Sequence, residues 1–353
     1  MKFSICIPNY NYERYVGRTV RSALAQTYED LEILVSDNAS TDRSVEVIRD
    51  AGDARVHLSV NQCNVGFAGN LDRAARMATG DRMIMLSSDD LMLPDALATY
   101  RALYDALGER GESCVASAAW DVIDADDRVT GYTGPNSAIW KATDRVPELE
   151  KQLGCPVYGV KACELLKRCI LAMKSPFNFA ATVYPRRLYQ AIEGYGGMRL
   201  INPDKWFHWR LLGVADTAYF LDRRLFAYRC HSSNQLSQET SMSSLKYLVD
   251  EYVSTLELDN GLLAKAGLSR EDAIAAFVEN DIANHGLATL ARGQRQRGRR
   301  ILDFGRATYP LHMRRNRKAW ALAALLALGP VGQRLARSAY RRWNEKLERA
   351  GRE

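Results

Sequence analysis

Short apolar runs alternate with segments of helical periodicity along the first hundred residues. Phe3–Ile7, Leu31–Val35, Val56–Val60 and Met83–Leu86 have the composition of strands, and the last is apolar at every position, as a strand buried on both faces is. Between these runs, apolar residues recur every three or four positions. The alternation predicts βαβ units, so we expect an α/β fold with a mainly parallel central sheet.

Two polar segments within this pattern are predicted to start helices. After the second strand, Ser40, Thr41 or Asp42 is expected as an N-cap, because short polar side chains accept hydrogen bonds from free helical N–H groups. Pro94 is expected in the first turn of a later helix, where proline is tolerated.

Polar loops follow three of the four strands. They read PNYN at 8–11, SDN at 36–38 and SSDD at 87–90. In open α/β sheets ligands bind beyond the carboxyl ends of the strands, so these loops are expected to meet there. The sequence predicts a site built from an aromatic ring, amides and carboxylates.

The rest of the chain changes character twice. Residues 114–228 mix short strands with turns, and from about residue 241 the pattern is helical. We therefore predict one domain over 1–235, made of two halves at 1–110 and 111–235. A helical, basic C-terminal region is expected over 236–353.

Composition places the chain among ordinary globular proteins, with 47% hydrophobic and 25% charged residues. The N-terminal apolar stretch is too short for a signal peptide or a membrane span. The seven cysteines are scattered without a CxxC pair. This spacing argues against a disulfide framework or a zinc site and favours reduced thiols in a cytoplasm.

The adjacent acids Asp89 and Asp90 are the first candidates for chemistry. No glycine-rich phosphate loop follows the first strand, so another device must hold any phosphate. Carboxylates that bind Mg²⁺ or Mn²⁺ would do so, since either ion shares its shell with diphosphate oxygens and water. The alternative is an Asx turn that caps the next helix, and for an isolated pair of acids we favour that alternative.

A series of motifs in a fixed order favours a functional role for Asp89 and Asp90 over the Asx turn. They read PNYN at 8–11, QTYEDLEI at 26–33, DNASTD at 37–42, NVG at 64–66, ATGD at 78–81 and SSDD at 87–90. In this order they resemble the nucleotide-binding half of family 2 glycosyltransferases. The resemblance implies a GT-A fold, in which a Rossmann-like nucleotide-binding half is fused to an acceptor-binding half.

The resemblance also implies roles for individual residues at the nucleotide. Pro8 and Tyr10 are expected to border the base, and Asp37 and Asn38 to bind base or ribose, although many relatives carry a second Asp at the position of Asn38. The full set of nucleotide-binding candidates is Pro8, Tyr10, Asn11, Asp37, Asn38, Asn64, Asn70, Ser88 and Asp89.

At the diphosphate, Asp89 corresponds to the second acid of the family's D-x-D element, and Ser87 replaces the first. The segment FAYRCHSSNQLS at 226–237 resembles the family's closing loop. The resemblance makes Asp89 and His231 metal ligands for Mg²⁺ or Mn²⁺. Asp90 and Arg229 are expected beside the donor sugar and its phosphates. The loss of the first acid makes weak or dispensable metal binding compatible with the sequence.

The catalytic base implied by the resemblance is Asp204, in the segment NPDKWFHWRL at 202–211. Pro203 before this acid departs from the family pattern. An N-cap role for Asp204 is the alternative, because a helix-like segment follows it.

We therefore expect an inverting glycosyltransferase that moves a sugar from a nucleoside-diphosphate sugar, UDP favoured, to a hydroxyl of a glycan or lipid-linked glycan in cell-surface polysaccharide synthesis. Ser87 and Pro203 keep open a catalytically silent sugar-nucleotide-binding or scaffold protein. A nucleotidyltransferase is a third alternative, but its glycine-rich, basic phosphate loop is missing.

The net charge of +6 is unevenly distributed. Residues 286–353 hold 17 Lys/Arg against 4 Asp/Glu, which leaves the preceding residues acidic. Arginine clusters flank the apolar stretch 319–328, a pattern typical of a helix on an anionic membrane surface. Ten apolar residues are too few to span a bilayer. We expect a cytoplasmic protein, peripheral on the inner face of the cell membrane; a homo-oligomer contact stays open, and no nucleic-acid motif accompanies the charge.

Overall fold

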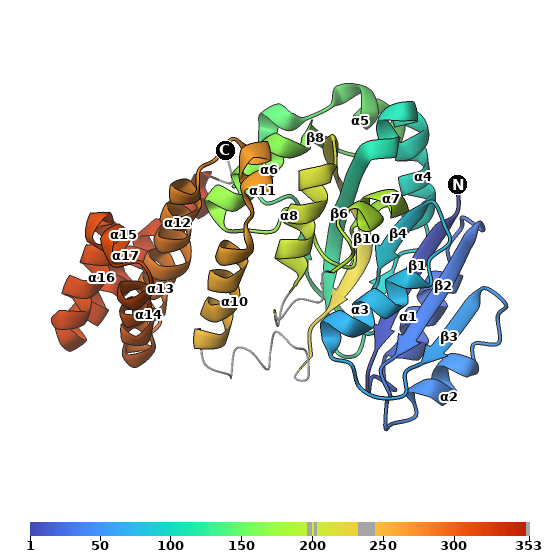
Figure 1. Cartoon of the computed structure of the whole chain (residues 1–353), viewed down its shortest axis with the longest axis horizontal. Coiled ribbons are helices and arrows are strands. Elements are labelled where there is room, and N and C mark those ends of the chain that lie inside the picture. The colour runs from blue at the N-terminus through green and yellow to red at the C-terminus, as the bar shows by residue number, and fades with distance from the viewer. Residues whose placement is uncertain (196–199, 201–202, 232–243, 351–353) are drawn as a thin grey trace. The chain divides into compact units, whose positions relative to one another are not determined.

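The computed structural model describes residues 1–195, 200, 203–231 and 244–350 (Figure 1). The chain forms two compact units, and each is described by itself. The α/β unit comprises Met1–Cys169 with Lys174–Asn234, and the helical unit comprises Ile170–Met173 with Gln235–Glu353. It stays a prediction that residues 1–110 bind the nucleotide sugar and residues 111–235 bind the acceptor.

A central sheet organises the α/β unit, with strand order β3-β2-β1-β4-β9-β6-β10-β5 and with β7 beside β6 and β8 beside β10. Strands β1 to β4 are parallel, as predicted, whereas antiparallel pairs join β9 to β4 and to β6. The strands are β1 (Phe3–Asn9), β2 (Leu31–Asp37), β3 (Val56–Val60), β4 (Arg82–Met85), β5 (Leu91–Met92), β6 (Cys114–Ile123), β7 (Val129–Thr133), β8 (Val157–Lys161), β9 (Val183–Pro185) and β10 (Thr217–Arg229).

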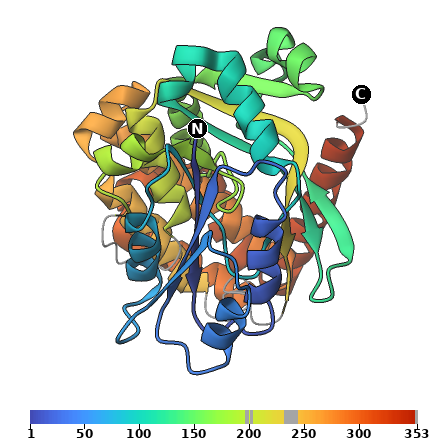
Figure 2. The ribbon, with the colours of Figure 1, turned by 90° about the vertical axis from the view of Figure 1, so that its right-hand side faces the viewer.

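Helices cover both faces of this sheet, and Figure 2 shows α1 and α3 on opposite sides of the blue strands. The strands β1, β2 and β4 are buried along their full length because of this double cover. The helices of the unit are α1 (Val16–Leu24), α2 (Ser44–Arg49), α3 (Phe67–Arg76), α4 (Ala96–Leu107), α5 (Pro147–Leu153), α6 (Ala162–Ala172, which ends in the helical unit), α7 (Arg186–Ala191) and α8 (Asp204–Val214).

Both predicted helix starts are wrong by a few residues. Helix α2 begins at Ser44, and its N-cap position is Arg43, whose side chain forms no capping hydrogen bond. Asp42 accepts hydrogen bonds from the N–H groups of Glu13 and Ser44, so its carboxylate ties two loops together. Pro94 precedes α4, whose N-cap position is Asp95, because the proline lies in the turn that leads into the helix.

A buried carboxylate joins three parallel strands near their amino ends. Glu32 of β2 accepts hydrogen bonds from Lys2 Nζ (2.6 Å) and Ser4 Oγ (2.6 Å), which lie at the start of β1. It also accepts from the backbone N–H of Thr79 (2.7 Å) and Gly80 (3.2 Å), just before β4. Burial alone would raise its pKa, but the hydrogen bonds, led by that from Lys2, outweigh burial and lower the pKa of Glu32 to about 2.

Gly80 is required where these strands approach one another. A Cβ atom at this position would lie 2.7 Å from the carbonyl oxygen of Lys2 and 2.8 Å from Ser4 Oγ. Asp81 then pairs with Lys2 through backbone and side chain, since Lys2 N donates to Asp81 Oδ2 (2.9 Å) and Asp81 N to Lys2 O (2.8 Å). The ATGD motif is therefore explained by packing at the start of β4.

The helical unit contains α10 (Ser244–Glu257), α11 (Asn260–Ala266), α12 (Arg270–Phe277), α13 (His285–Ala291), α14 (Arg295–Thr308), α15 (Pro310–Arg315), α16 (Arg317–Ala327) and α17 (Gly329–Ala350). A π-helical segment, Val278–Asn284, joins α12 to α13. Over the described ranges, no helix combines the length and apolar character that a bilayer crossing demands. All seven cysteines are free, and three of them, Cys6, Cys114 and Cys169, are buried.

The Glu32 network generates a stability prediction. Glu32→Gln should lower the free energy of unfolding by about 2 kcal/mol near neutral pH, because a charged acceptor is lost from a buried site. Urea unfolding across pH checks this. Since the pKa of Glu32 is lowered from 4.5 to about 2, the difference from wild type should be full above pH 4.5 and fade toward pH 2.

The matched control is Glu29→Gln, which changes an exposed acid close to the start of the same strand. It should shift the unfolding free energy by less than about 0.5 kcal/mol. Equal effects of the two substitutions, or a difference independent of pH, would contradict the role of Glu32.

Candidate active site at the carboxyl edge of the sheet

Strand register brings the polar loops to one edge of the sheet. Asn9 at the end of β1 pairs with Asp37 at the end of β2. Strand β4 aligns with β1 up to Cys6 and Met85, and the N–H of Leu86 donates to Cys6 O (2.8 Å). The loops that follow the three strands therefore leave the sheet side by side, as predicted.

The first group of side chains at this edge is centred on Asp37, which has no exposed surface. Its carboxylate accepts from Asn9 Nδ2 (2.7 Å) and from the N–H (2.9 Å) and Oγ (2.6 Å) of Ser40. Ser40 Oγ also accepts from the N–H of Asn11, a residue with φ of 56°. In this structure Asp37 shapes the loop, and its predicted contact with base or ribose stays a prediction.

Asn38 connects this loop to the turn that precedes α3. Its Nδ2 donates to Asn64 Oδ1 (2.8 Å) and Gly66 O (3.3 Å), and its Oδ1 accepts from Asn61 Nδ2 (3.1 Å) and Val65 N (2.9 Å). The side chain thus uses its two N–H donors and its carbonyl oxygen within the protein. It organises the NVG turn, in which Gly66 has φ of 80°.

Asn70 of α3 is used in the same way. Its Nδ2 donates to the carbonyl oxygens of Asn9 (3.2 Å) and Ser36 (3.0 Å), and its Oδ1 accepts from Ser36 Oγ (2.7 Å). The contact holds the ends of β1 and β2 against the first turn of α3. Tyr10, by contrast, is 41% exposed and leaves a ring free for a ligand at this rim.

The Asp89–Asp90 loop is anchored to α1 by a buried hydroxyl. Thr19 Oγ1 lies 3.0 Å from Ser88 O and 2.9 Å from Asp90 O. Ser88, Asp89 and Asp90 are each less than a tenth exposed. Burial and then the charge of Asp89 raise the pKa of Asp90 well above its ordinary value. Asp89 is the acid of this pair that faces another functional side chain.

That side chain is His231, which follows β10. Its Nε2 lies 3.0 Å from Asp89 Oδ2. The imidazole packs on Tyr15 of α1, with ring centroids 4.6 Å apart, and near Tyr12 at 6.0 Å. Residues 142 positions apart in sequence thus form one polar pair at the edge of the sheet.

Arg229, at the end of β10, is buried against the acidic loop. Instead of lying open to a phosphate, its side chain has no exposed surface. Its Nε donates to Asp89 O (2.7 Å), its N–H to Asp90 Oδ1 (2.9 Å), and its guanidinium pairs with Asp127 and lies over the ring of Tyr15. In this structure Arg229 is a buried clamp that joins β10 to the acidic loop, and its place beside the donor phosphates stays a prediction.

The residues present fit a divalent cation with few protein ligands. Asp89 supplies a carboxylate and His231 an imidazole within 3.0 Å of each other. Among the residues that the structure describes, no three His, Cys, Asp or Glu side chains are grouped as a metal cage. An ion held by these two groups would therefore take most of its ligands from diphosphate and water, which suits Mg²⁺ or Mn²⁺.

Asp204 lies in the first turn of α8, and the N-cap position is Pro203. The N-cap alternative is therefore wrong, because Pro203 holds the N-cap position and Asp204 is the first residue of the helix. Phe207, one turn further, packs on Tyr184 of β9 and stacks on Tyr195. Figure 1 shows the N-terminal end of α8 on the same side of the α/β unit as the carboxyl ends of β1 and β10. Position 202 and the closing-loop positions 232–237 lie outside the described residues.

Three residues of this edge were missed from the sequence. Thr19 and Tyr15 lie one turn apart on α1, and Asp127 lies in the turn between β6 and β7. The position of Thr19 among the apolar residues of a helix was a signal that could have indicated a buried hydrogen bond. No signal in the sequence could have revealed the pairing of Asp127 with Arg229, because neither segment contains a local pattern that points to its partner.

The clamp can be tested by Arg229→Gln. We expect unfolding to become easier by about 3 kcal/mol, because removing one partner leaves a buried network unsatisfied. Urea unfolding measures the change. Arg224→Gln is the control on the same strand, because its guanidinium is 59% exposed and its ion pair with Asp121 is peripheral. A cost for Arg229→Gln no larger than that of Arg224→Gln would refute the clamp.

Comparisons with known proteins agree with this geometry. A model of the glycosyl transferase family 2 matches residues 4–150. An uncharacterised glycosyltransferase from Nostoc sp. is 26% identical over 292 residues, covering 76% of this chain and 80% of that protein. WfaP of Escherichia coli, a UDP-Glc:alpha-D-GlcNAc-diphosphoundecaprenol beta-1,3-glucosyltransferase, is 38% identical over 87 residues, which is 25% of this chain and 35% of WfaP.

The fold is shared with solved structures at low identity. Staphylococcus aureus TarS 1–349 in complex with UDP-GlcNAc superposes with a TM-score of 0.61 at 18% identity, covering 97% of this chain and 92% of that chain. The mannosyltransferase PcManGT from Pyrobaculum calidifontis, solved with GDP-Man and Mn²⁺, gives a TM-score of 0.52 at 15% identity, covering 96% and 84%. The predicted fold class is confirmed: the chain has the GT-A fold, and its residues 4–150 match the glycosyl transferase family 2.

Proposed function

We propose that this glycosyltransferase moves a sugar from a nucleoside-diphosphate sugar, with UDP favoured, to a hydroxyl of a glycan or lipid-linked glycan in cell-surface polysaccharide synthesis. The observation that carries the proposal is the pairing of Asp89 with His231 at the carboxyl edge of the sheet. Support for the donor comes from the UDP-GlcNAc in the TarS structure and the UDP-Glc in the name of WfaP.

The nucleotide would lie along the edge formed by the first two loops. Tyr10 and Asn11 are exposed there, so the phenol ring is available to stack on a base. Pro8, Asp37, Asn38 and Asn70 are buried beneath this rim and hold its shape. We assign base contact to the exposed residues and support to the buried ones.

The diphosphate would lie at Asp89 and His231, with Mg²⁺ or Mn²⁺ held by the same two residues. When bound, such an ion neutralises the charge that develops on a departing diphosphate. Burial and the charge of Asp89 raise the pKa of Asp90, so it holds a proton more readily than an exposed acid does. Its backbone and carboxylate are fixed by Thr19 and Arg229. These contacts hold Asp89 in place before the donor arrives.

Asp204 is the proposed catalytic base. Its carboxylate would take the proton of the acceptor hydroxyl while that oxygen bonds to the anomeric carbon and the bond from that carbon to the diphosphate oxygen breaks. Attack opposite the leaving group inverts the anomeric centre, so an α-linked donor yields a β-linked product. The first turn of α8 also favours a negative charge at this position through the helix dipole.

The basic helical unit supports an acceptor at a membrane surface. Residues 295–337 contain eleven Lys/Arg and a single Asp. Such a surface would be attracted to anionic lipids, with each basic side chain near the surface contributing about 1 kcal/mol. We therefore propose peripheral attachment to the inner face of the cell membrane, where a lipid-linked glycan would be presented.

The second candidate is a catalytically silent sugar-nucleotide-binding or scaffold protein. It is favoured by Ser87 in place of the first acid of the D-x-D element and by the small number of metal ligands within the described chain. Release of nucleoside diphosphate from a donor sugar separates the two candidates, because only an enzyme turns the donor over.

Asp204→Asn tests the proposed base. Turnover should fall about a thousandfold, because the amide cannot accept the hydroxyl proton, while affinity for nucleoside diphosphate should stay within about threefold. Release of UDP from UDP-sugars with and without a glycan acceptor measures the first effect, and calorimetry measures the second. Asp216→Asn, an exposed acid just beyond α8, is the matched control.

A fully active Asp204→Asn enzyme would remove Asp204 as the base. A wild-type protein that binds the donor without ever releasing nucleoside diphosphate would favour the silent candidate.

Asp89→Asn tests the diphosphate end of the site. Calorimetry with UDP, GDP and dTDP, each with and without Mn²⁺, should show tightest binding of UDP to the wild type in the presence of Mn²⁺. The variant should lose about tenfold in that metal-dependent affinity, because one charged ligand is gone. Asp105→Asn changes an exposed acid of α4 and should leave binding unaltered. Undiminished Mn²⁺-dependent binding by Asp89→Asn would show that the metal is held elsewhere.

A further inference from the structure

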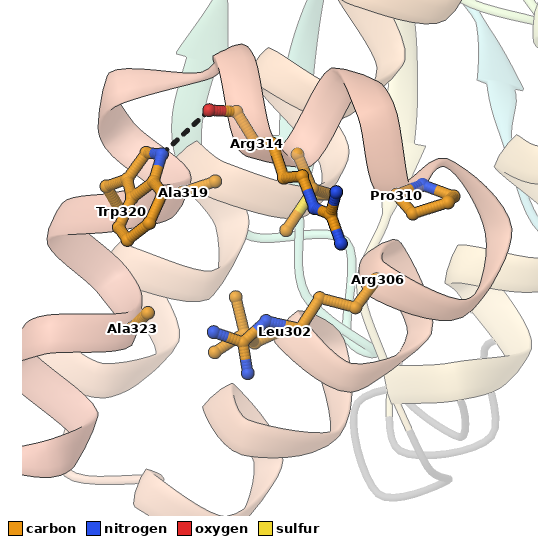
Figure 3. A pocket seen from close by; sticks show the side chains of 8 residues that line it. Leu302, Arg306, Pro310, Arg314, Ala319, Trp320 and Ala323 are labelled. Atoms are coloured by element: carbon orange, nitrogen blue, oxygen red, sulfur yellow. Dashed lines mark hydrogen bonds between the residues drawn. The ribbon is translucent and has the colours of Figure 1, made fainter.

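A pocket of about 330 Å³ lies within the helical unit, between α14, α15 and α16 (Figure 3). Its inner wall is apolar, since Leu302, Met313 and Ala319 line it and are each at most 5% exposed. Two arginines, Arg306 and Arg314, complete its lining from α14 and α15. The pocket therefore joins an apolar interior to a cationic mouth.

Arg306 and Arg314 bring two positive charges to the mouth of the pocket. Both are exposed, and among the described residues neither forms an ion pair or a side-chain hydrogen bond. No acidic residue lines the pocket. A neighbouring cation behaves differently, because Lys318 pairs with Glu279. Figure 3 shows both guanidinium groups extending into the space between the helices. Two unpaired guanidinium groups at one mouth favour an anion with several oxygens.

Trp320 stands at the rim of the same pocket. Its indole Nε1 donates to Arg314 O (2.8 Å), and its side chain remains 62% exposed (Figure 3). The turn that carries it is fixed by Asn316, whose Oδ1 accepts from Ala319 N (2.9 Å) and whose Nδ2 donates to Glu279 (2.6 Å). A rigidly held, exposed tryptophan is typical of the boundary between water and lipid.

The outer face of α16 continues this apolar surface. From Ala319 to Leu328 the sequence contains no polar side chain, and Ala321, Ala324 and Leu328 are exposed. At about 1.5 Å per residue the segment is near 15 Å long, half the thickness of a bilayer core, so it can lie on a membrane and cannot cross it. An exposed apolar helix bordered by arginines fits an anionic lipid surface.

We propose that this pocket binds the phosphate group of an anionic membrane lipid, with Arg306 and Arg314 on the phosphate oxygens and the lipid's apolar part against Leu302, Met313 and Trp320. Charge complementarity at the mouth and the apolar wall behind it both favour a phospholipid over a free phosphate, which would leave the wall uncovered. The inference rests on the proposed membrane attachment and adds to it a specific lipid site.

The test uses the full chain and paired substitutions of equal charge. R306Q/R314Q neutralises the pocket mouth, and R299Q/R300Q neutralises two exposed arginines of α14 that do not line this pocket. Co-sedimentation with vesicles of phosphatidylcholine mixed with phosphatidylglycerol measures membrane binding. The pocket variant should lose at least about tenfold in affinity and the control less than about threefold, because only the former removes direct phosphate contacts as well as surface charge.

Calorimetry distinguishes the source of the phosphate. A short-chain phosphatidic acid should bind the wild type and not R306Q/R314Q, whereas inorganic phosphate and pyrophosphate should bind at least about tenfold more weakly. Blue-shifted tryptophan emission on addition of vesicles, absent in Trp320→Phe, is expected because Trp320 lies at the rim.

The experiments distinguish a failure of the proposed membrane attachment from a failure of the proposed lipid pocket. If wild-type protein ignores anionic vesicles, membrane attachment itself fails, whatever the activity toward donor sugars. If the two double variants weaken binding equally, the surface acts by diffuse charge and the pocket proposal is overturned. Equal affinity for inorganic phosphate and short-chain lipid would overturn it in favour of a free-anion site. Concentration-dependent self-association abolished by Trp320→Phe would overturn it in favour of a contact with a second copy.

Discussion

The hydrogen-bonded carboxylate of Glu32 sets the relative register of β1, β2 and the segment before β4. It is buried, and it accepts hydrogen bonds from the start of β1 and from the segment before β4. The absence of a Cβ at Gly80 lets these segments approach closely enough for the bonds to form. A slip of one residue along any of these strands would break the network and turn every side chain to the other face. The amino edge of the sheet is thereby fixed, and with it the opposite edge, where the chemistry lies.

At that opposite edge, buried polar contacts again fix the backbone, here between the loop after β4 and the end of β10. Thr19 and Arg229 hold the backbone of the acidic loop, and His231 follows Arg229 closely enough to meet Asp89. The site is therefore assembled from the β4 loop, the first helix and the end of the tenth strand. These buried groups fix the backbone on both sides of the site. The Asp89 carboxylate and the His231 imidazole therefore meet there, although the described residues form no larger cluster of metal ligands around them.

Much of the first hundred residues was predictable because local patterns decide it. The apolar runs marked β1 to β4 closely, and polar loops after parallel strands must share an edge. Gln26 and Glu32, which the family motif includes, proved structural: Gln26 Nε2 donates to Leu93 O (2.8 Å) and its Oε1 accepts from Leu97 N (3.1 Å) at the start of α4. A motif shows that a residue type is needed at a position, but it does not show whether the need is structural or functional.

The order β9-β6-β10 and the place of Arg229 could not be predicted in this way. Short strands carry no information about their partners, and the contact from Arg229 to Asp90 spans 139 positions. An arginine beside a histidine and two acids looks like a phosphate ligand until its burial is known. The helix starts at Ser44 and Ala96 were missed because a polar residue near a helix can serve a loop as well as a cap.

The central claim is that the carboxyl edge of the sheet is the sugar-nucleotide site. A crystal structure of this chain with a UDP-sugar and Mn²⁺ tests it most directly. The account predicts the diphosphate and the metal beside Asp89 and His231, the base at Tyr10, and Arg229 still buried beneath the acidic loop. A donor bound away from Asp89 and His231, or an Arg229 released from Asp89 to hold the phosphates, would contradict it.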